Sequence, residues 1–121
     1  MKNILYTLAL LVSFSSFGQD AKQGLVTEYY ESGEVKNKVN YVDGKEQGEY
    51  IVYYESGAVE WKGNCVDGQL QGERIWYYKS GEVEVKGNYE GGLLQGERIY
   101  YNVNGEIEKT KNYKDGFLIE D

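Results

Sequence analysis

Recurrent acidic side chains are the first candidates for chemistry in this 121-residue chain. Carboxylates that precede a glycine, as in calcium loops, are Asp43, Asp67 and Asp115. No Asp-x-Asp-x-Asp-Gly pattern accompanies them, so we interpret them as turn residues. Carboxylates that resemble the acid and base of a glycosidase are Glu60, Glu84 and Glu108. Because these recur 24 residues apart, we interpret them as a solvated ridge on one face of a sheet.

Nucleophilic catalysis lacks its usual components in this sequence. The chain has no His and a single Cys, Cys65. This excludes Ser-His and Cys-His catalysis, most zinc sites and an internal disulfide. We interpret Cys65 as a small buried hydrophobe. The sequence therefore predicts a protein that is not an enzyme and has no catalytic residues, no cofactor and no metal.

The N-terminal residues have the pattern of a secretory signal peptide. Lys2 precedes an apolar run over residues 4–12, and small residues follow at Ser16 and Gly18. The run is short for a membrane span, and no Cys follows the small residues as in a lipoprotein. We predict a signal peptide over 1–18, a mature domain over 19–121, and export to the periplasm or the cell exterior. Membrane contact is expected only through an uncleaved signal segment.

The charge of the chain argues against two classes of partner. Thirteen Lys and Arg against 20 Asp and Glu give a formal net charge of −7. A negative surface disfavours binding to nucleic acid and to anionic lipid. A protein partner remains the expectation.

A repeat of 24 residues organises the chain from residue 24 onward. The repeat units are 24–47, 48–71, 72–95 and 96–121. The columns that share this step include Gly24, Gly48, Gly72 and Gly96, then Tyr29, Tyr53, Tyr77 and Tyr101, and then Gly44, Gly68, Gly92 and Gly116. The pattern predicts four copies of one structural unit.

Each unit has the pattern of a β-hairpin. In the second unit, aromatic and β-branched residues fill 49–54, and a second strand is expected near 59–65. Ser56-Gly57 and Asp67-Gly68 are two-residue turn signals. The fold class predicted is therefore all-β, an elongated antiparallel meander of four 24-residue hairpins.

Two-residue turns also predict a register. Tyr54 would oppose Val59, Val52 would oppose Trp61, and Cys65 would oppose Leu70. The same register predicts three cross-strand charge pairs, which are Lys38 with Glu49, Lys62 with Glu73, and Lys86 with Glu97. One face of the sheet would collect apolar and aromatic side chains, and the other would collect polar ones.

The combined spacing resembles the MORN repeat variant, found in bacterial proteins described as YwqK-type antitoxins. The matching residues are Gly48, Tyr53, Tyr54, Gly57, Gly63, Asp67, Gly68 and Gly72. The resemblance implies a stack of β-hairpins with a binding or scaffolding role. The terminal units depart from the pattern at Thr27, Asn102, Lys109 and Lys111, as expected of caps on an open-ended stack.

The apolar face of such a sheet must be covered by something. Either twist folds it into a groove, a second copy packs on it as a homo-oligomer, or another protein does. The candidate partner contacts are Tyr54, Trp61, Trp76, Tyr78 and Tyr89. The Tyr columns either line a binding groove or form a packing ladder between hairpins, and we interpret them as the ladder. The function predicted is an exported interaction or scaffolding module, with an antitoxin or immunity-like inhibitor and a cell-wall glycan binder as alternatives.

Overall fold

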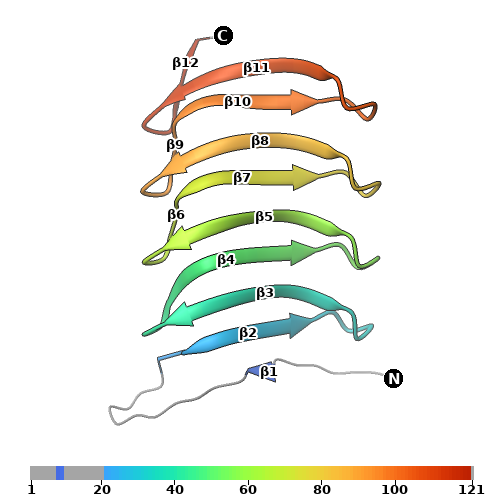
Figure 1. The fold of residues 1–121 in the computed structure, drawn as a ribbon, viewed down its shortest axis with the longest axis vertical. Coiled ribbons are helices and arrows are strands. Elements are labelled where there is room, and N and C mark those ends of the chain that lie inside the picture. Colours follow the sequence, from blue (N-terminus) through green and yellow to red (C-terminus); the bar gives the residue numbers. More distant parts are fainter. Residues whose placement is uncertain (1–7, 10–20, 121) are drawn as a thin grey trace.

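The computed structural model describes residues 8–9 and 21–120, and these form one antiparallel sheet of 12 strands (Figure 1). The predicted signal peptide lies outside the described residues, apart from a two-residue strand. The strands are β1 (Leu8–Ala9), β2 (Gly24–Tyr29), β3 (Val35–Val42), β4 (Lys45–Tyr53), β5 (Val59–Val66), β6 (Gln69–Leu70), β7 (Gly72–Tyr77), β8 (Val83–Glu90), β9 (Leu93–Leu94), β10 (Gly96–Tyr101), β11 (Ile107–Lys114) and β12 (Phe117–Glu120). The strands follow one another in space in chain order, so the predicted meander of hairpins is confirmed.

The Asp-Gly turns adopt the predicted left-handed geometry. Asp67 has a φ of 51° and Gly68 a φ of 85°, as a type I′ turn requires at its two central positions. Asp43 and Asp115 have φ values of 51° and 50°. The interpretation of these acidic residues as turn residues is therefore confirmed.

The Ser-Gly turns differ from the prediction. The amide of Gly57 donates to the carbonyl of Tyr54, and the amide of Tyr54 donates to the carbonyl of Ala58. Together with a φ of 101° at Gly57, this is a three-residue loop that ends in a glycine bulge. Val59 therefore opposes Tyr53, and the predicted pairing of Tyr54 with Val59 is wrong.

A second irregularity restores the predicted register beyond this loop. The pairing shifts by one residue between Val52 and Tyr53, after which Val52 opposes Trp61 as predicted. The three-residue loop shifts the pairing by one residue, and the extra residue at Glu60 shifts it back by one. The predicted faces of the sheet are therefore correct in the body of each hairpin.

The predicted charge pairs are wrong. Lys62 opposes Ile75 instead of Glu73, and Lys38 opposes Ile51 instead of Glu49. Lys86 likewise opposes Ile99 instead of Glu97. The cause is a two-residue shift after the type I′ turn: Cys65 still opposes Leu70 as predicted, but the strand then kinks at Gly72, whose φ is 88°. An even shift leaves each side chain on its predicted face.

Hydrogen bonds at both ends of the strands connect consecutive repeats. At one end, the hydroxyls of Tyr30, Tyr54 and Tyr78 donate to the carbonyls of Tyr53, Tyr77 and Tyr101. At the other, Gln47 accepts from the amide of Asp67 at 2.7 Å, and Gln71 accepts from that of Gly91 at 2.8 Å. The Tyr ladder confirms that these tyrosines tie hairpins together. The Gln column was not recognised in the sequence, although its members are spaced 24 apart.

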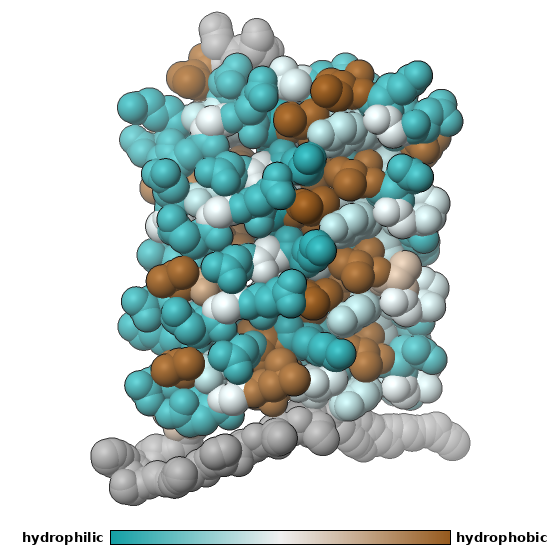
Figure 2. All heavy atoms as spheres, in the orientation of Figure 1, coloured by the Kyte–Doolittle hydropathy of each residue, from teal (hydrophilic) through white to brown (hydrophobic). Residues whose placement is uncertain are grey.

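The core is small because the sheet has a single layer. The buried apolar side chains among the described residues are Val26, Val39, Cys65, Val85 and Tyr89. Strand alternation and register place all of them on one face. Cys65 is 4% exposed, which agrees with its interpretation as a buried hydrophobe. Figure 2 shows apolar side chains recurring in every repeat between polar ones.

Candidate partner-binding face

A row of aromatic and arginine side chains crosses the buried-core face of the sheet. We call it the aromatic–arginine row. Its members are Tyr50 on β4, Trp61 on β5, Arg74 and Trp76 on β7, and Arg98 and Tyr100 on β10. They meet because alternate residues of a strand share a face and the register sets Trp61 directly opposite Trp76.

The rings and guanidinium groups of the row stack on one another. The Tyr50 and Trp61 ring centroids are 5.0 Å apart and stacked, and those of Trp61 and Trp76 are 6.4 Å apart. The Cζ atom of Arg74 lies 3.8 Å from the Trp61 ring centroid and 4.1 Å from that of Trp76. Arg74 therefore makes cation–π contacts with both Trp residues of the protein.

Arg98 continues the row into the fourth repeat. Its Cζ atom lies 5.3 Å from the Trp76 ring centroid and 5.5 Å from that of Tyr100. The Nζ atom of Lys109 lies 5.1 Å from the centroid of the same Tyr100 ring. Cations and rings thus alternate from β7 to β11.

Two glycines make room for leucine side chains that lie next to the arginine stems. A Cβ atom on Gly63 would lie 3.3 Å from Leu70 Cδ2 and 3.5 Å from Arg74 Cγ. A Cβ atom on Gly87 would lie 3.1 Å from Leu94 Cδ2 and 3.6 Å from Arg98 Cγ. The absence of a side chain at these strand positions therefore leaves space for Leu70 and Leu94, and the arginine stems would be in ordinary contact with an added Cβ.

Partial burial leaves Arg74 with unused hydrogen-bonding capacity. Burial lowers the pKa of its guanidinium from the ordinary value, while the Coulombic effect of Tyr89 opposes this shift. Its Nε atom, like that of Arg98, is buried and has no hydrogen-bond partner among the described residues. An unpaired buried donor is unfavourable, so the stacking energy of the rings must offset this cost.

The sequence identified the centre of the row but not all of it. Trp61 and Trp76 lie in the row, and Tyr89 is buried beside Arg74. Tyr54 and Tyr78 are instead committed to the next repeat through their hydroxyls. The members that were missed are Tyr50, Arg74, Arg98 and Tyr100. The sequence does contain a pattern that marks three of them, because Tyr50, Arg74 and Arg98 are spaced 24 residues apart.

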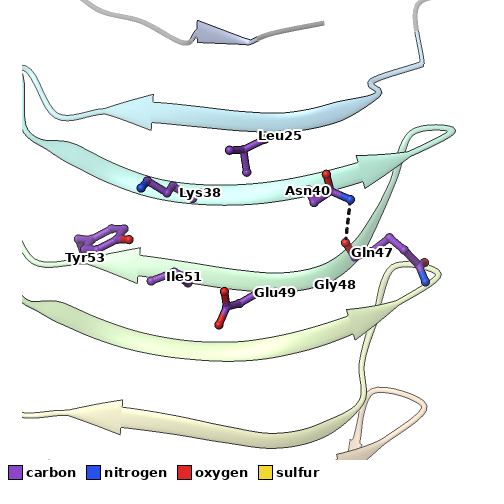
Figure 3. Close-up of a pocket in the computed structure, with 8 residues that line it drawn as sticks. All are labelled: Leu25, Lys38, Asn40, Gln47, Gly48, Glu49, Ile51 and Tyr53. Carbon is purple, nitrogen blue, oxygen red and sulfur yellow. Dashed lines mark hydrogen bonds between the residues drawn. The ribbon is translucent and has the colours of Figure 1, made fainter. Parts of the chain in front are cut away.

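The opposite face has a shallow hollow of 440 Å³ in the first two repeats (Figure 3). Its lining residues are Leu25, Lys38, Asn40, Gln47, Gly48, Glu49, Ile51 and Tyr53. The Asn40 side-chain amide donates to the carbonyl of Gln47 at 3.1 Å, which fixes one end, and Lys38 and Tyr53 lie at the other. Without a nucleophile adjacent to a base, this lining does not form a catalytic arrangement.

Comparison with known families agrees with this geometry. A sequence profile of the MORN repeat variant matches residues 22–43 and 70–90. These two segments are similar to the MORN repeat variant. The MORN resemblance predicted from the sequence is therefore confirmed. MORN repeats are binding modules and do not constitute an enzyme family. No curated protein matches the chain.

The matched MORN segments cover corresponding parts of different hairpins. Residues 22–43 span β2 and β3, and residues 70–90 span β7 and β8. Each match thus contains one pair of long strands and the three-residue loop between them. Within the described residues, no helix is long and apolar enough to cross a membrane.

Proposed function

We propose that this protein is an exported, non-enzymatic interaction module that binds another protein through the aromatic–arginine row. The main support is that Trp61, Arg74 and Trp76 form a half-buried cluster on the sheet. Within the described residues, no second layer covers this cluster. Trp, Tyr and Arg are the residues most enriched among binding hot spots. Export is supported by the signal-like pattern of residues 1–18.

The chemistry of the row indicates what its partner must offer. The guanidinium groups of Arg74 and Arg98 are held in place by rings before any partner arrives, so little side-chain entropy is lost on binding. Preorganised arginines favour a carboxylate in bidentate geometry. The partner surface we propose therefore combines acidic and apolar side chains.

Arg74 also distinguishes this proposal from sugar binding. A glycan binder stacks sugar rings on open aromatic faces. The guanidinium of Arg74 already lies over both Trp61 and Trp76. A protein partner that contacts the row from above needs no displacement of this arginine.

The test compares two variants of the full chain in the cells that produce it. Tagged Arg74→Glu reverses the charge in the row, and tagged Glu49→Arg changes an exposed residue of the opposite face. We expect the partners captured with the wild type to be lost with Arg74→Glu and retained with Glu49→Arg, while circular dichroism shows that both variants fold. Equal capture by both variants, or loss by Glu49→Arg alone, would contradict the proposal.

A further inference from the structure

The two ends of the sheet break the repeat pattern at the positions where one repeat meets the next. In the interior, Trp61 opposes Trp76 and Val85 opposes Tyr100 across the boundary between repeats. Moving one repeat further from Val85 gives Lys109 on β11. The residue equivalent to Trp76 two repeats earlier in the chain is Glu28 on β2. Two columns therefore face each other across the repeat boundaries, where Asn37 also opposes Val52, and their unpaired end members are the oppositely charged Lys109 and Glu28.

The neighbouring column behaves in the same way. Lys62 opposes Ile75 and Lys86 opposes Ile99 at the interior boundaries. The corresponding end residues are Thr110 on β11 and Thr27 on β2. Opposite charges and Thr–Thr pairs are both favourable across antiparallel strands. In the register of the interior boundaries, the residues that depart from the repeat pattern at one end would therefore oppose complementary residues at the other end.

From this match we propose that copies of this chain associate head to tail, with β2 of one copy pairing with β11 of the next. The interface reproduces an internal repeat boundary, with Glu28 opposite Lys109 and Thr27 opposite Thr110. It is heterologous, so it extends into a short linear array. It joins the edges of two sheets and does not cover the face that carries the aromatic–arginine row, although Lys109 also contacts Tyr100 of that row.

The backbone at the β11 edge has the right shape for this pairing. β12 pairs with β11 at Lys114 and Tyr113 in the way that β6 pairs with β5, and after a one-residue shift Glu120 of β12 also pairs with Asn112. In the interior, β7 then continues the pairing after β6. Within residues 21–120, positions 107–111 of β11 pair with β10 only. β2 of a second copy corresponds to β7 and fills this place as an added strand.

The residues at both edges are available to a second copy. Glu28, Lys109 and Thr110 are exposed, although Glu28 accepts a hydrogen bond from the Asn37 side chain and Lys109 lies over the Tyr100 ring. The β2 edge is covered by β1 at two positions, where Leu8 opposes Thr27 and Ala9 opposes Val26. The proposed boundary also has two residue pairs and shares Thr27 with β1, so the second copy docks once the predicted leader is removed or displaced from this edge.

Disulfide trapping tests the proposed register directly. Glu28→Cys protein is mixed with Lys109→Cys protein, each purified as the cell produces it, under mild oxidation. The matched control replaces Glu28→Cys by Glu49→Cys, an exposed Glu on an interior strand. The wild-type chain, whose Cys65 is buried, controls for background oxidation. We expect a mixed dimer from Glu28→Cys with Lys109→Cys in several-fold excess over the control pair.

Charge reversal gives an independent readout by sedimentation. Lys109→Glu should weaken self-association by roughly twofold to fivefold, because like charges then face each other. Adding Glu28→Lys to the same chain should restore it. A wild-type chain that stays monomeric at every concentration, equal trapping of the control pair, or no recovery in the double variant would overturn the proposal.

Discussion

The hydroxyl of Tyr54 donates a 2.5 Å hydrogen bond to the carbonyl oxygen of Tyr77, 23 residues further along the chain. The same bond joins Tyr30 to Tyr53 and Tyr78 to Tyr101. In the fourth repeat the column holds Asn102, whose side-chain oxygen instead accepts from the amides of Asn104 and Glu106 in its own loop. The ladder thus ends in a residue that satisfies its local loop, as a terminal cap should.

Removing one rung of this ladder should weaken the sheet measurably. Tyr54→Phe deletes the hydroxyl and leaves the carbonyl of Tyr77 without this donor. We expect a loss of about 1 kcal/mol in the free energy of unfolding, typical of one hydrogen bond. The midpoint of urea denaturation measures it. Tyr53→Phe, in the neighbouring column, is the matched control and should change the midpoint little; an equal effect of both variants would contradict the role of the ladder.

Alkaline pH should weaken the same ladder. Burial, with Glu60 adding to it, raises the pKa of Tyr30 and Tyr54 above the ordinary value of 10.0. The unfolded chain therefore loses these protons at lower pH than the folded protein does. Their contribution to stability is complete below about pH 10 and is lost as the pH rises through the folded-state pKa.

Denaturation midpoints across a pH series measure this dependence. The midpoint should fall above about pH 10 in the wild type, and Tyr54→Phe should fall less steeply because one titrating rung is missing. Identical slopes in the two proteins would show that these tyrosines do not link pH to stability.

The sequence predicted the hairpins and faces well because those depend on periodicity alone. The 24-residue step and the Asp-Gly turns determine where strands begin and end, and alternation then determines the face of each residue. The pairing partners were harder to predict. The loop at Gly57 and the kink at Gly72 each add residues whose number depends on backbone φ, and Ser-Gly does not distinguish a two-residue turn from a three-residue loop.

The aromatic–arginine row was also predicted only in part, but the reason differs from that for the pairing partners. Trp61 and Trp76 attract attention by residue type, whereas an arginine is normally expected in solvent. Arg74 on β7 contacts the ring of Trp61 on β5, and its stem lies beside Gly63, which is also on β5. That relationship joins residues on two strands and depends on the true register, so the column of Tyr50, Arg74 and Arg98 could not be interpreted from spacing alone.

Filling the space beside Arg98 should destabilise the sheet in a way that a second substitution relieves. An added Cβ on Gly87 meets Leu94 Cδ2 at 3.1 Å, which is closer than ordinary contact. We expect Gly87→Ala to lower the unfolding free energy by about 1 kcal/mol through overpacking. In a Leu94→Ala background the same change should be neutral or stabilising, since Ala is then the better strand residue. A double-mutant cycle measures the coupling, and an equal cost in both backgrounds would exclude the steric cause.

The Gln column should protect the Asp-Gly turns. Gln47 accepts from the amide of Asp67, and the amide of Gly68 donates to the carbonyl of Glu46. Gln47→Ala removes the first contact and leaves the second. We expect hydrogen exchange at the Asp67 amide to become several-fold faster, with the turn at Asp115 unchanged because it relies on Gln95. Faster exchange at both turns would indicate general destabilisation instead.

Arg74 can be observed through the fluorescence of the protein's own tryptophans. The chain has two Trp residues, and the Arg74 guanidinium contacts both, so the emission reports on this cluster alone. Arg74→Lys keeps the charge but loses the planar group that stacks on the rings. We expect a changed emission maximum and a loss of roughly 1 kcal/mol in the free energy of unfolding. The control is Arg98→Lys, which should change the emission less because the Arg98 Cζ atom lies 5.3 Å from the Trp76 ring centroid. If Arg74→Lys left the emission as in the wild type, the guanidinium would not be stacked in solution, and the preorganisation on which the proposed binding face depends would be absent.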